Sequence, residues 1–231
     1  MKADEIIKLC NLEDSHWWYA ERRSILTKLV LKYKLHGKAL DIGAAGGGNT
    51  QVLTANGLDA TALEFDDSGI QVCNFRGVSC IQGDAREIPL EDDSLDLVIA
   101  FDLLEHVVED SLVVKEMHRT LKRGGHMFVV VPTGSDLWSS HDVAVNHVRR
   151  YDQGELRALI NSQDLEILEH WSWNILLRPI VKIRRMSLRE SDLNKINPFV
   201  NAVLRTLVVI ERPLSTLKVK GVSEFLVARK R

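Results

Sequence analysis

Short apolar runs alternate with amphipathic segments through much of this chain of 231 residues. Runs that are apolar at nearly every position are typical of strands buried on both faces of a sheet. Such runs predict strands at 38–42, 61–64, 78–82, 95–101 and 126–131. Helical spacing of apolar residues predicts helices at 50–56 and 111–123, which Gly57 and Gly124 end. This alternation predicts an α/β fold with a doubly wound parallel sheet and helices on both faces.

A further helix is predicted before the first strand, at 14–33, with Asp14 or Ser15 as its cap. Its apolar residues recur at intervals of three and four and include Trp18. The dense aromatic cluster at 16–19 indicates a lid over a ligand pocket, whereas core packing explains Trp18 better.

The C-terminal part of the chain adds two strand signals and one helix signal. Residues 165–171 alternate between apolar and polar and residues 224–229 are largely apolar, which predicts two more strands. An apolar stripe at 193–210 predicts a helix that begins at Asn197 and Pro198. The predicted parts are therefore an N-terminal helical lid at 1–37 and an α/β domain at 38–231 with a helical insert at about 175–215.

The composition suits a globular protein, because 45% of the residues are hydrophobic and 27% are charged. No apolar run reaches the roughly 18 residues that span a bilayer. The first residues include acids where a signal peptide would be basic and then apolar, so we expect a cytoplasmic protein. Cys10, Cys73 and Cys80 contain no C-x-x-C pair, which predicts buried reduced thiols rather than a zinc site.

The net charge of −2 is unevenly distributed along the chain. From Leu176 onward there are 13 Lys or Arg residues against 4 Asp or Glu residues. This asymmetry indicates either an anionic partner for the basic end or ordinary solvated surface.

A glycine-rich turn follows the first predicted strand. Gly43 and the run 46–48 let the backbone turn tightly and approach a ligand. The next helix directs its free N–H groups at this turn, which lies at the strand ends where α/β proteins bind ligands. A dinucleotide and S-adenosylmethionine both suit such a turn, although a dinucleotide fingerprint would need glycine at the position of Ala45.

Acidic residues follow the next two strands at the same edge of the sheet. Glu64 lies about 20 residues beyond the turn, where an acid can accept hydrogen bonds from both hydroxyls of a ribose. An exposed loop acid is the alternative interpretation of Glu64. Phe65 can lie against an adenine face, and Asp84, after the third strand, can accept from the adenine amino group.

Residues 38–132 resemble class I S-adenosylmethionine-dependent methyltransferases, and among them the type 11/12-like members. The residues that carry this resemblance are Leu-Asp-Ile-Gly at 40–43, Glu64, Gly-Asp-Ala at 83–85, Asp-Leu-Val at 96–98, Leu-Glu-His at 104–106 and Leu-Lys-Arg-Gly-Gly at 121–125. A dinucleotide enzyme would share the first two features, but the runs at 83–85 and 121–125 are not expected in it. The resemblance implies a Rossmann-like, seven-stranded, mostly parallel sheet whose last strand is antiparallel.

The resemblance also implies a role for each residue at the strand ends. The turn would hold the methionine end of S-adenosyl-L-methionine, Glu64 the ribose, Asp84 and Ala85 the adenine, and Phe101 and Asp102 would flank the sulfonium. The full set of residues expected to contact the cofactor is Asp41, Gly43, Ala44, Ala45, Gly46, Asn49, Glu64, Phe65, Asp84, Ala85, Phe101, Asp102 and Leu103.

Residues 133–151 form the predicted acceptor side. The run His-x-Arg-Arg-Tyr at 147–151 resembles a loop over the acceptor pocket in a subset of these methyltransferases. Methyl transfer to a hydroxyl is an in-line displacement that proton removal assists, and a histidine suits that task. The candidate catalytic residues are His147, His106 and Tyr151, with His141 as a further candidate base. A hydrogen-bonded structural histidine is the alternative for His147.

Other residues of this region have two interpretations. Arg149 and Arg150 either bind an anionic group of the acceptor or belong to solvated surface. Asp152 and Glu155 match a capping box ahead of a helix. No metal site is predicted, because His141, Asp142 and His147 do not have a recognised ligand spacing.

The helical insert at 175–215 mixes basic and apolar residues, which leaves three roles open. It covers the sheet, forms the interface of a homodimer, or rests on an anionic membrane surface. The protein is expected to be a monomer or a homodimer. Membrane contact would make the cytoplasmic protein membrane-peripheral and would suit a lipid- or glycan-linked acceptor. No basic–aromatic stacking array indicates a nucleic-acid partner.

We therefore expect an enzyme that transfers a methyl group from S-adenosyl-L-methionine to a small or lipid- or sugar-linked acceptor, at oxygen. The product of the cofactor would be S-adenosyl-L-homocysteine. An NAD(P)-dependent oxidoreductase and a non-catalytic cofactor-binding module remain as alternatives.

Overall fold

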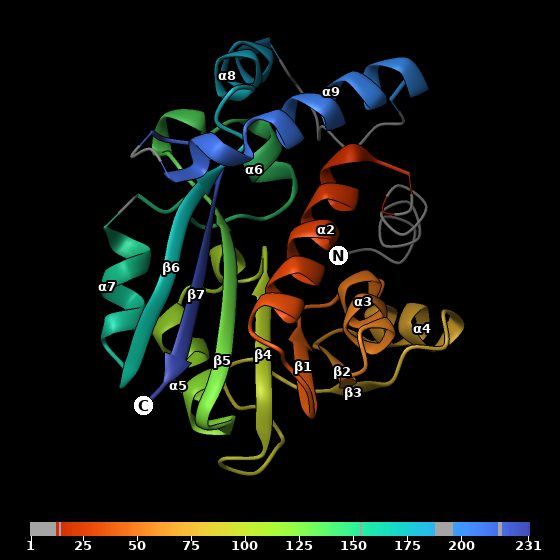
Figure 1. Cartoon of the computed structure of the whole chain (residues 1–231), viewed down its shortest axis with the longest axis vertical. Helices are drawn as coiled ribbons and strands as arrows, with labels where there is room; N and C mark the ends of the chain where they lie inside the picture. The colour runs from red at the N-terminus through yellow and green to blue at the C-terminus, as the bar shows by residue number, and fades with distance from the viewer. Residues whose placement is uncertain (1–12, 14, 153, 188–195, 217–218) are drawn as a thin grey trace.

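The computed structural model describes residues 13, 15–152, 154–187, 196–216 and 219–231 (Figure 1). The strands are β1 (Lys38–Ile42), β2 (Asp59–Glu64), β3 (Cys80–Gln82), β4 (Leu95–Phe101), β5 (Leu121–Pro132), β6 (Leu165–Trp173) and β7 (Ser223–Lys230). The α-helices are α2 (Trp17–Lys32), α3 (Gly48–Ala55), α4 (Asp67–Phe75), α5 (Asp110–Thr120), α6 (Ser140–Ala144), α7 (Glu155–Asn161), α8 (Arg178–Ser187) and α9 (Pro198–Ile210). The 3-10 turns are η1 (Leu104–His106), η2 (Ser135–Leu137) and η3 (Arg212–Thr216).

The strands form one seven-stranded sheet in the order β3-β2-β1-β4-β5-β7-β6. The pairs among β1 to β5 are parallel, whereas β7 is antiparallel to both β5 and β6. The predicted mostly parallel sheet with an antiparallel last strand is therefore confirmed. A doubly wound dinucleotide fold has the order 3-2-1-4-5-6, so the insertion of β7 between β5 and β6 distinguishes this sheet from it.

Side chains of the central strands alternate between two core layers, one on each face of the sheet. In β4, Val98 and Ala100 join the layer that includes α5 and α7, while Leu97 and Ile99 join the layer that includes α2, α3 and α9 (Figure 1). Full burial of one such side chain stabilises the fold by about 1.5–3 kcal/mol. The apolar run at 97–101 in β4 follows from this double burial.

The α2 helix belongs to the second core layer, where Leu26 and Val30 are buried. It begins at Trp17 rather than at residue 14, because His16 is its N-cap and accepts through Nδ1 from the Trp18 N–H at 3.3 Å. The predicted cap Asp14 lies outside the described residues, as do Cys10, Leu193 and residues 1–12 of the predicted lid. The lid therefore stays a prediction.

Two predictions at helix ends are wrong. The α5 helix ends at Thr120 rather than at Gly124, because Leu121 begins β5 and pairs with Leu95 of β4. Strand pairing outweighs the helical spacing of the apolar residues there. The predicted capping box ahead of α7 is only half formed: Glu155 accepts from the Asp152 N–H at 2.7 Å, but Gly154 is the N-cap.

The α8 and α9 helices lie together beyond the end of the sheet where β5 finishes and β7 begins (Figure 1). Asn197 caps α9 as predicted, by accepting from the Phe199 N–H at 2.9 Å. The helix buries Val208, whereas Val200 and Ile210 of the predicted stripe are exposed. Among the described residues, no helix is long and apolar enough to cross a membrane.

Candidate functional site

The turn after β1 reaches the carboxyl edge of the sheet in a left-handed backbone conformation. The φ angles of Gly43, Ala45 and Gly47 are 68°, 52° and 73°. A Cβ at Gly43 would lie 2.8 Å from Cδ1 of Leu103, so only glycine fits that position. For Ala45 the left-handed conformation costs about 1–2 kcal/mol. The tight turn therefore lies against the end of β4, where Leu103 follows the strand.

The remaining predicted residues of the turn lie at its base. Ala44 is buried in a small core cluster with Cys73, which confirms the prediction of a buried thiol for Cys73, whereas Cys80, which packs against this cluster, is half-buried. Gly46 is buried, and Asn49 is half-buried in the first turn of α3.

Glu64 connects the end of β2 to this turn, because its carboxylate accepts a hydrogen bond from the Ala45 N–H. Burial raises the pKa of Glu64 to about 7, although the hydrogen bond from Ala45 opposes the change. Asp41 is 1% exposed and accepts from the Thr50 hydroxyl at 2.7 Å. Burial also raises the pKa of Asp41 to about 7. Two carboxyl groups with raised pKa values beside one turn are typical of a functional site.

The predicted adenine-side residues follow β2 and β3, which pair in register from Ala62 to Glu64. Asp84 accepts from the Arg86 N–H at 2.8 Å and from Arg86 Nη2 at 2.7 Å, and these hydrogen bonds lower the pKa of Asp84. Ala85 packs against the core, and the Phe65 side chain is exposed. These residues therefore share the edge of the sheet that carries Glu64.

Asp102 follows β4 and forms an ion pair with Arg22 of α2, with Nη1 and Oδ2 2.5 Å apart. The guanidinium of Arg22 lies 5.6 Å from the centre of the Phe101 ring and 5.9 Å from that of Phe225. The Arg22 side chain is almost fully buried. The carboxylate expected beside a sulfonium cation thus already has a cationic neighbour, which the sequence did not predict.

The predicted acceptor side brings His106 and His147 together at the end of β4. Their ring centres are 4.8 Å apart, and Val148 N donates to the Glu105 carbonyl at 2.8 Å, which fastens the loop of His147 to η1. Glu105 is fully buried, with Oε1 3.8 Å from His147 Nε2. Burial and the charge of Asp102 raise the pKa of Glu105. The three side chains form the group we call the Glu105 cluster: Glu105, His106 and His147.

Asp142, at the third position of α6, orients His147 of this cluster. It accepts from His147 Nδ1 at 2.8 Å and from Arg150 Nε at 2.7 Å, and it closes a capping box with Ser139. Burial alone would raise the pKa of Asp142, but the hydrogen bond from His147 and the charges of Arg150 and Arg185 hold it well below its ordinary value. Asp142 is therefore a buried anion that fixes His147.

Three residues of the acceptor loop have internal partners in place of the roles expected for them. Tyr151 is 2% exposed and donates its hydroxyl to Asp110 at 2.7 Å, so it does not face the Glu105 cluster. Arg149 pairs with Asp110 at 2.7 Å, and Arg150 pairs with Asp142. Arg150 is buried and not solvated, whereas the Arg149 side chain is 34% exposed, and an acceptor role for either arginine stays a prediction. Because its hydroxyl is already bonded in the core, we no longer count Tyr151 as catalytic.

Sequence reasoning gave no site role to Glu105, and it considered Asp142 only as a metal ligand with an unfavourable spacing. Arg22 lies beside the aromatic cluster at 16–19, which is compatible with the rim of a pocket but does not predict its ion pair. The other two are acids whose importance depends on burial. The sequence Leu-Glu-His at 104–106 does not show that Glu105 is buried, because that burial depends on tertiary packing.

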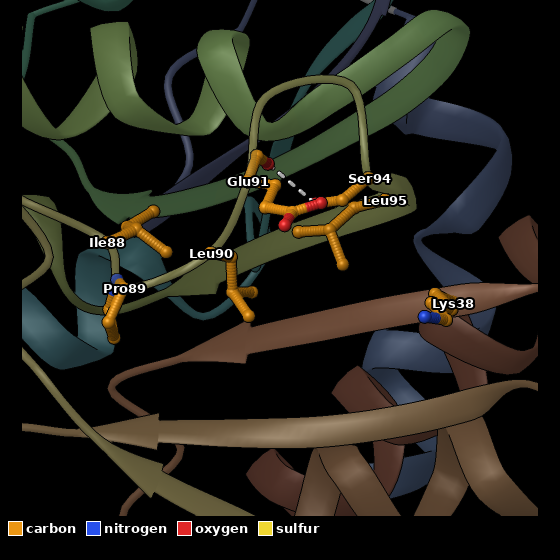
Figure 2. Close-up of a pocket in the computed structure, with 7 residues that line it drawn as sticks. All are labelled: Lys38, Ile88, Pro89, Leu90, Glu91, Ser94 and Leu95. Carbon is orange, nitrogen blue, oxygen red and sulfur yellow. Dashed lines mark hydrogen bonds between the residues drawn. The ribbon is translucent and has the colours of Figure 1, made fainter.

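A pocket of about 600 Å³ lies at the amino ends of the strands, where Lys38 begins β1 and Leu95 begins β4 (Figure 2). Figure 2 shows Ser94 bonded to Glu91 in the loop that frames it, at 2.7 Å. Because α/β proteins bind ligands at the carboxyl ends of the strands, this pocket is not the candidate site.

Residues 40–129 match the family model described as a methyltransferase domain. A "Probable S-adenosylmethionine-dependent methyltransferase" of Mycobacterium tuberculosis is 23% identical over 154 residues, which cover 65% of this chain and 56% of that protein. A ubiquinone biosynthesis O-methyltransferase of Pseudomonas syringae is 27% identical over 118 residues, which cover 48% of this chain and 47% of that protein. This chain therefore spans about half the length of these relatives.

The crystal structure of a "putative sarcosine dimethylglycine methyltransferase" from Galdieria sulphuraria has a similar fold. It superposes with a TM-score of 0.64 at 18% identity, covering 92% of this chain and 86% of that one. At this identity the likeness concerns the fold.

Proposed function

Since the chain belongs to the class I S-adenosylmethionine-dependent methyltransferase family, we propose that it transfers the methyl group of this cofactor to a hydroxyl oxygen of a small or lipid-linked acceptor. The observation that carries the proposal is the contact of Glu64 with the turn after β1. This contact supports the proposal, because it joins the acid proposed to bind the ribose to the turn proposed to bind the methionine end. The name of the ubiquinone biosynthesis relative favours oxygen as the target atom.

Calorimetry with S-adenosylmethionine and with NAD(P) tests the cofactor, and methyl transfer to a panel of hydroxyl acceptors tests the reaction. We expect binding of S-adenosylmethionine and turnover with at least one acceptor. Binding without turnover across a broad panel would favour the non-catalytic module. Binding of a nicotinamide cofactor alone would refute the proposal.

We expect the affinity for S-adenosylmethionine to rise between pH 5.5 and about pH 7. The pKa of Glu64 is raised to about 7, and ribose hydroxyls donate best to its ionised carboxylate. Binding would therefore lower this pKa and release up to one proton. Below pH 7, the dissociation constant then falls by up to about tenfold for each unit by which the pH rises. Calorimetry in buffers of different ionisation enthalpy measures the proton released.

The matched variants for this prediction are Glu64→Gln and Asp84→Asn. Glu64→Gln weakens binding about tenfold at pH 8, about 1.4 kcal/mol, and flattens the pH profile. Asp84→Asn weakens binding and leaves the profile unchanged, because the pKa of Asp84 is already low. An unchanged slope in folded Glu64→Gln would contradict the assignment of Glu64.

His147 is the proposed base that removes the acceptor proton. Asp142 accepts from its Nδ1, which leaves Nε2 of the neutral imidazole as the basic nitrogen. His106 lies beside it, and burial and the charge of His147 lower the pKa of His106. An imidazole held through Nδ1 in this way can accept the proton of the acceptor at Nε2.

The lipid-linked form of the acceptor is proposed from the exposed faces of α8 and α9. Ile183 is 70% exposed and Phe199 is 76% exposed. The two helices contain Arg178, Lys182, Arg184, Arg185 and Arg205 and no acidic residue. Asp136 pairs with Arg178 and Lys182, and Asp142 lies 3.4 Å from Arg185, so the exposed apolar side chains carry more of the proposed contact than the charges do. An apolar face with basic residues suits an anionic membrane surface. Because Arg185 donates to the Leu137 carbonyl at 3.1 Å, α8 contacts the acceptor side directly.

Sedimentation with phosphatidylglycerol vesicles tests this membrane contact. We expect binding at low salt that high salt weakens, and at least tenfold weaker binding for the double variant Ile183→Glu, Phe199→Glu. Phe75→Glu is the matched control, because Phe75 is 91% exposed on the distant helix α4. No binding at low salt, or an equal loss in Phe75→Glu, would remove the membrane from the proposal.

A further inference from the structure

The Glu105 cluster offers three donor atoms of types that bind metals. One atom from each of Glu105, His106 and His147 lies within 4.8 Å of the other two. His147 Nε2 and Glu105 Oε1 are 3.8 Å apart. Ligand atoms around a tetrahedral ion with bonds of 2.0–2.2 Å are about 3.3–3.5 Å apart. Side-chain adjustments of about an ångström would therefore close the cluster around a cation.

Both histidines are held by a second contact through the other ring nitrogen. His147 Nδ1 faces Asp142 Oδ1 at 2.8 Å, and His106 Nδ1 faces the Asn146 carbonyl at 3.3 Å. An acceptor at Nδ1 fixes the proton there and leaves the Nε2 lone pair for a ligand bond. Carboxylate and carbonyl partners of this kind accompany most histidine ligands of metals.

Among the described residues, the arginines around the cluster pair with other carboxylates, so the only ion-pair contact of Glu105 is His147 Nε2 at 3.8 Å. Arg22 pairs with Asp102, and Arg150 pairs with Asp142. Glu105 is fully buried, and neither of its carboxylate oxygens has a hydrogen-bond partner among the described residues. A buried ionised carboxylate is costly unless it is paired or coordinates a metal. A cation at the cluster would supply the missing partner of Glu105.

We propose that Glu105, His106 and His147 bind one divalent first-row transition cation at the end of β4. Two imidazoles and one carboxylate suit Zn²⁺, Co²⁺ or Fe²⁺ better than Mg²⁺ or Ca²⁺, which prefer oxygen ligands. Three protein ligands leave a coordination position open, as in catalytic zinc sites. In the metal-bound protein His147 is a ligand rather than the base.

The open position would hold the acceptor oxygen, a step that rests on the proposed function. A cation lowers the pKa of a bound hydroxyl, so its proton leaves to solvent. The oxygen then forms a bond to the methyl carbon while the carbon–sulfur bond breaks and its electron pair stays on sulfur. Cation binding itself does not depend on this step.

Titration of the chelator-treated 231-residue chain with Co²⁺ tests the site. Visible absorption and calorimetry report stoichiometry and affinity. We expect one Co²⁺ per chain, displaced by Zn²⁺, and binding at least tenfold weaker in Glu105→Gln and His147→Asn. His141→Asn and Cys80→Ser are the controls and stay within threefold, because His141, whose ring is 6.3 Å from that of His147, and Cys80 lie outside the cluster.

Absence of stoichiometric Co²⁺ binding, or an equal loss in a control variant, would overturn the proposal. If Glu105→Gln does not fold, His106→Asn takes its place, and unchanged affinity in this folded variant has the same meaning. S-adenosylmethionine binding by the metal-free protein separates the two proposals. If it persists without a Co²⁺ site, only the metal site fails. If Co²⁺ binds and S-adenosylmethionine does not, only the proposed function fails.

Discussion

Replacing Arg150 by alanine is expected to lower the free energy of unfolding by about 3 kcal/mol, the lower end of the range for breaking a buried ion pair. The side chains of Arg150 and Asp142 are 1% and 0% exposed, and Nε and Oδ1 are 2.7 Å apart. Without the guanidinium, the Asp142 carboxylate remains buried with less compensation. It keeps the Ser139 N–H at 2.9 Å and His147, which is why we expect the lower end.

Urea denaturation of the wild type, Arg150→Ala and Arg149→Ala measures this effect. Arg149 is the matched control, because it carries the same group one position earlier but its side chain is 34% exposed. Partly exposed ion pairs contribute roughly 0–1 kcal/mol. A loss below about 1 kcal/mol in Arg150→Ala, or equal losses in both variants, would contradict the central role of the buried pair.

Replacing His147 by alanine is expected to lower kcat by about 10²–10⁴-fold, the typical contribution of a positioned acid or base. Affinity for S-adenosylmethionine should stay within threefold, because His147 lies on the acceptor side rather than at the turn after β1. The expectation holds whether His147 removes the acceptor proton or holds a cation that acidifies it. Steady-state kinetics at saturating cofactor, together with calorimetry, separates the two quantities.

His118→Ala is the control for this experiment. His118 lies on α5, and its carbonyl accepts from Lys230 Nζ at 2.9 Å, away from the Glu105 cluster. We expect its kcat to remain close to that of the wild type. A fall of less than about fivefold in folded His147→Ala would exclude both roles of His147.

The sheet was predictable because its signals are local. Most strands are short apolar runs, β6 alternates between apolar and polar residues, and Gly43 and the glycines that follow it mark the turn after β1. A strand that is buried on both faces of a sheet needs apolar residues at nearly every position, and such a run can be recognised without knowledge of the rest of the fold. The end of α5 was not predictable, because Leu121 is apolar in a helix and in a strand, and only its pairing with Leu95 decides between them.

The site was predictable only in part, since its contacts join distant parts of the chain. Glu64 was proposed from its place at the end of β2. The ion pair between Arg22 and Asp102 joins residues 80 positions apart. The basic neighbours of Asp142 are Arg150, in the loop after α6, and Arg185, on α8. Charge pairing of this kind depends on how α2 and the acceptor loop pack, which no periodicity encodes.

The position of β7 has a consequence for biosynthesis. This strand is the last described in sequence but lies between β5 and β6. Until residues 223–230 have left the ribosome, the edges of β5 and β6 that pair with β7 stay open, and such edges are templates for wrong pairing. The β5 and β6 strands are therefore joined only after β7 is made. Chaperones that shield strand edges should matter more for this protein than for a protein whose strands pair in chain order.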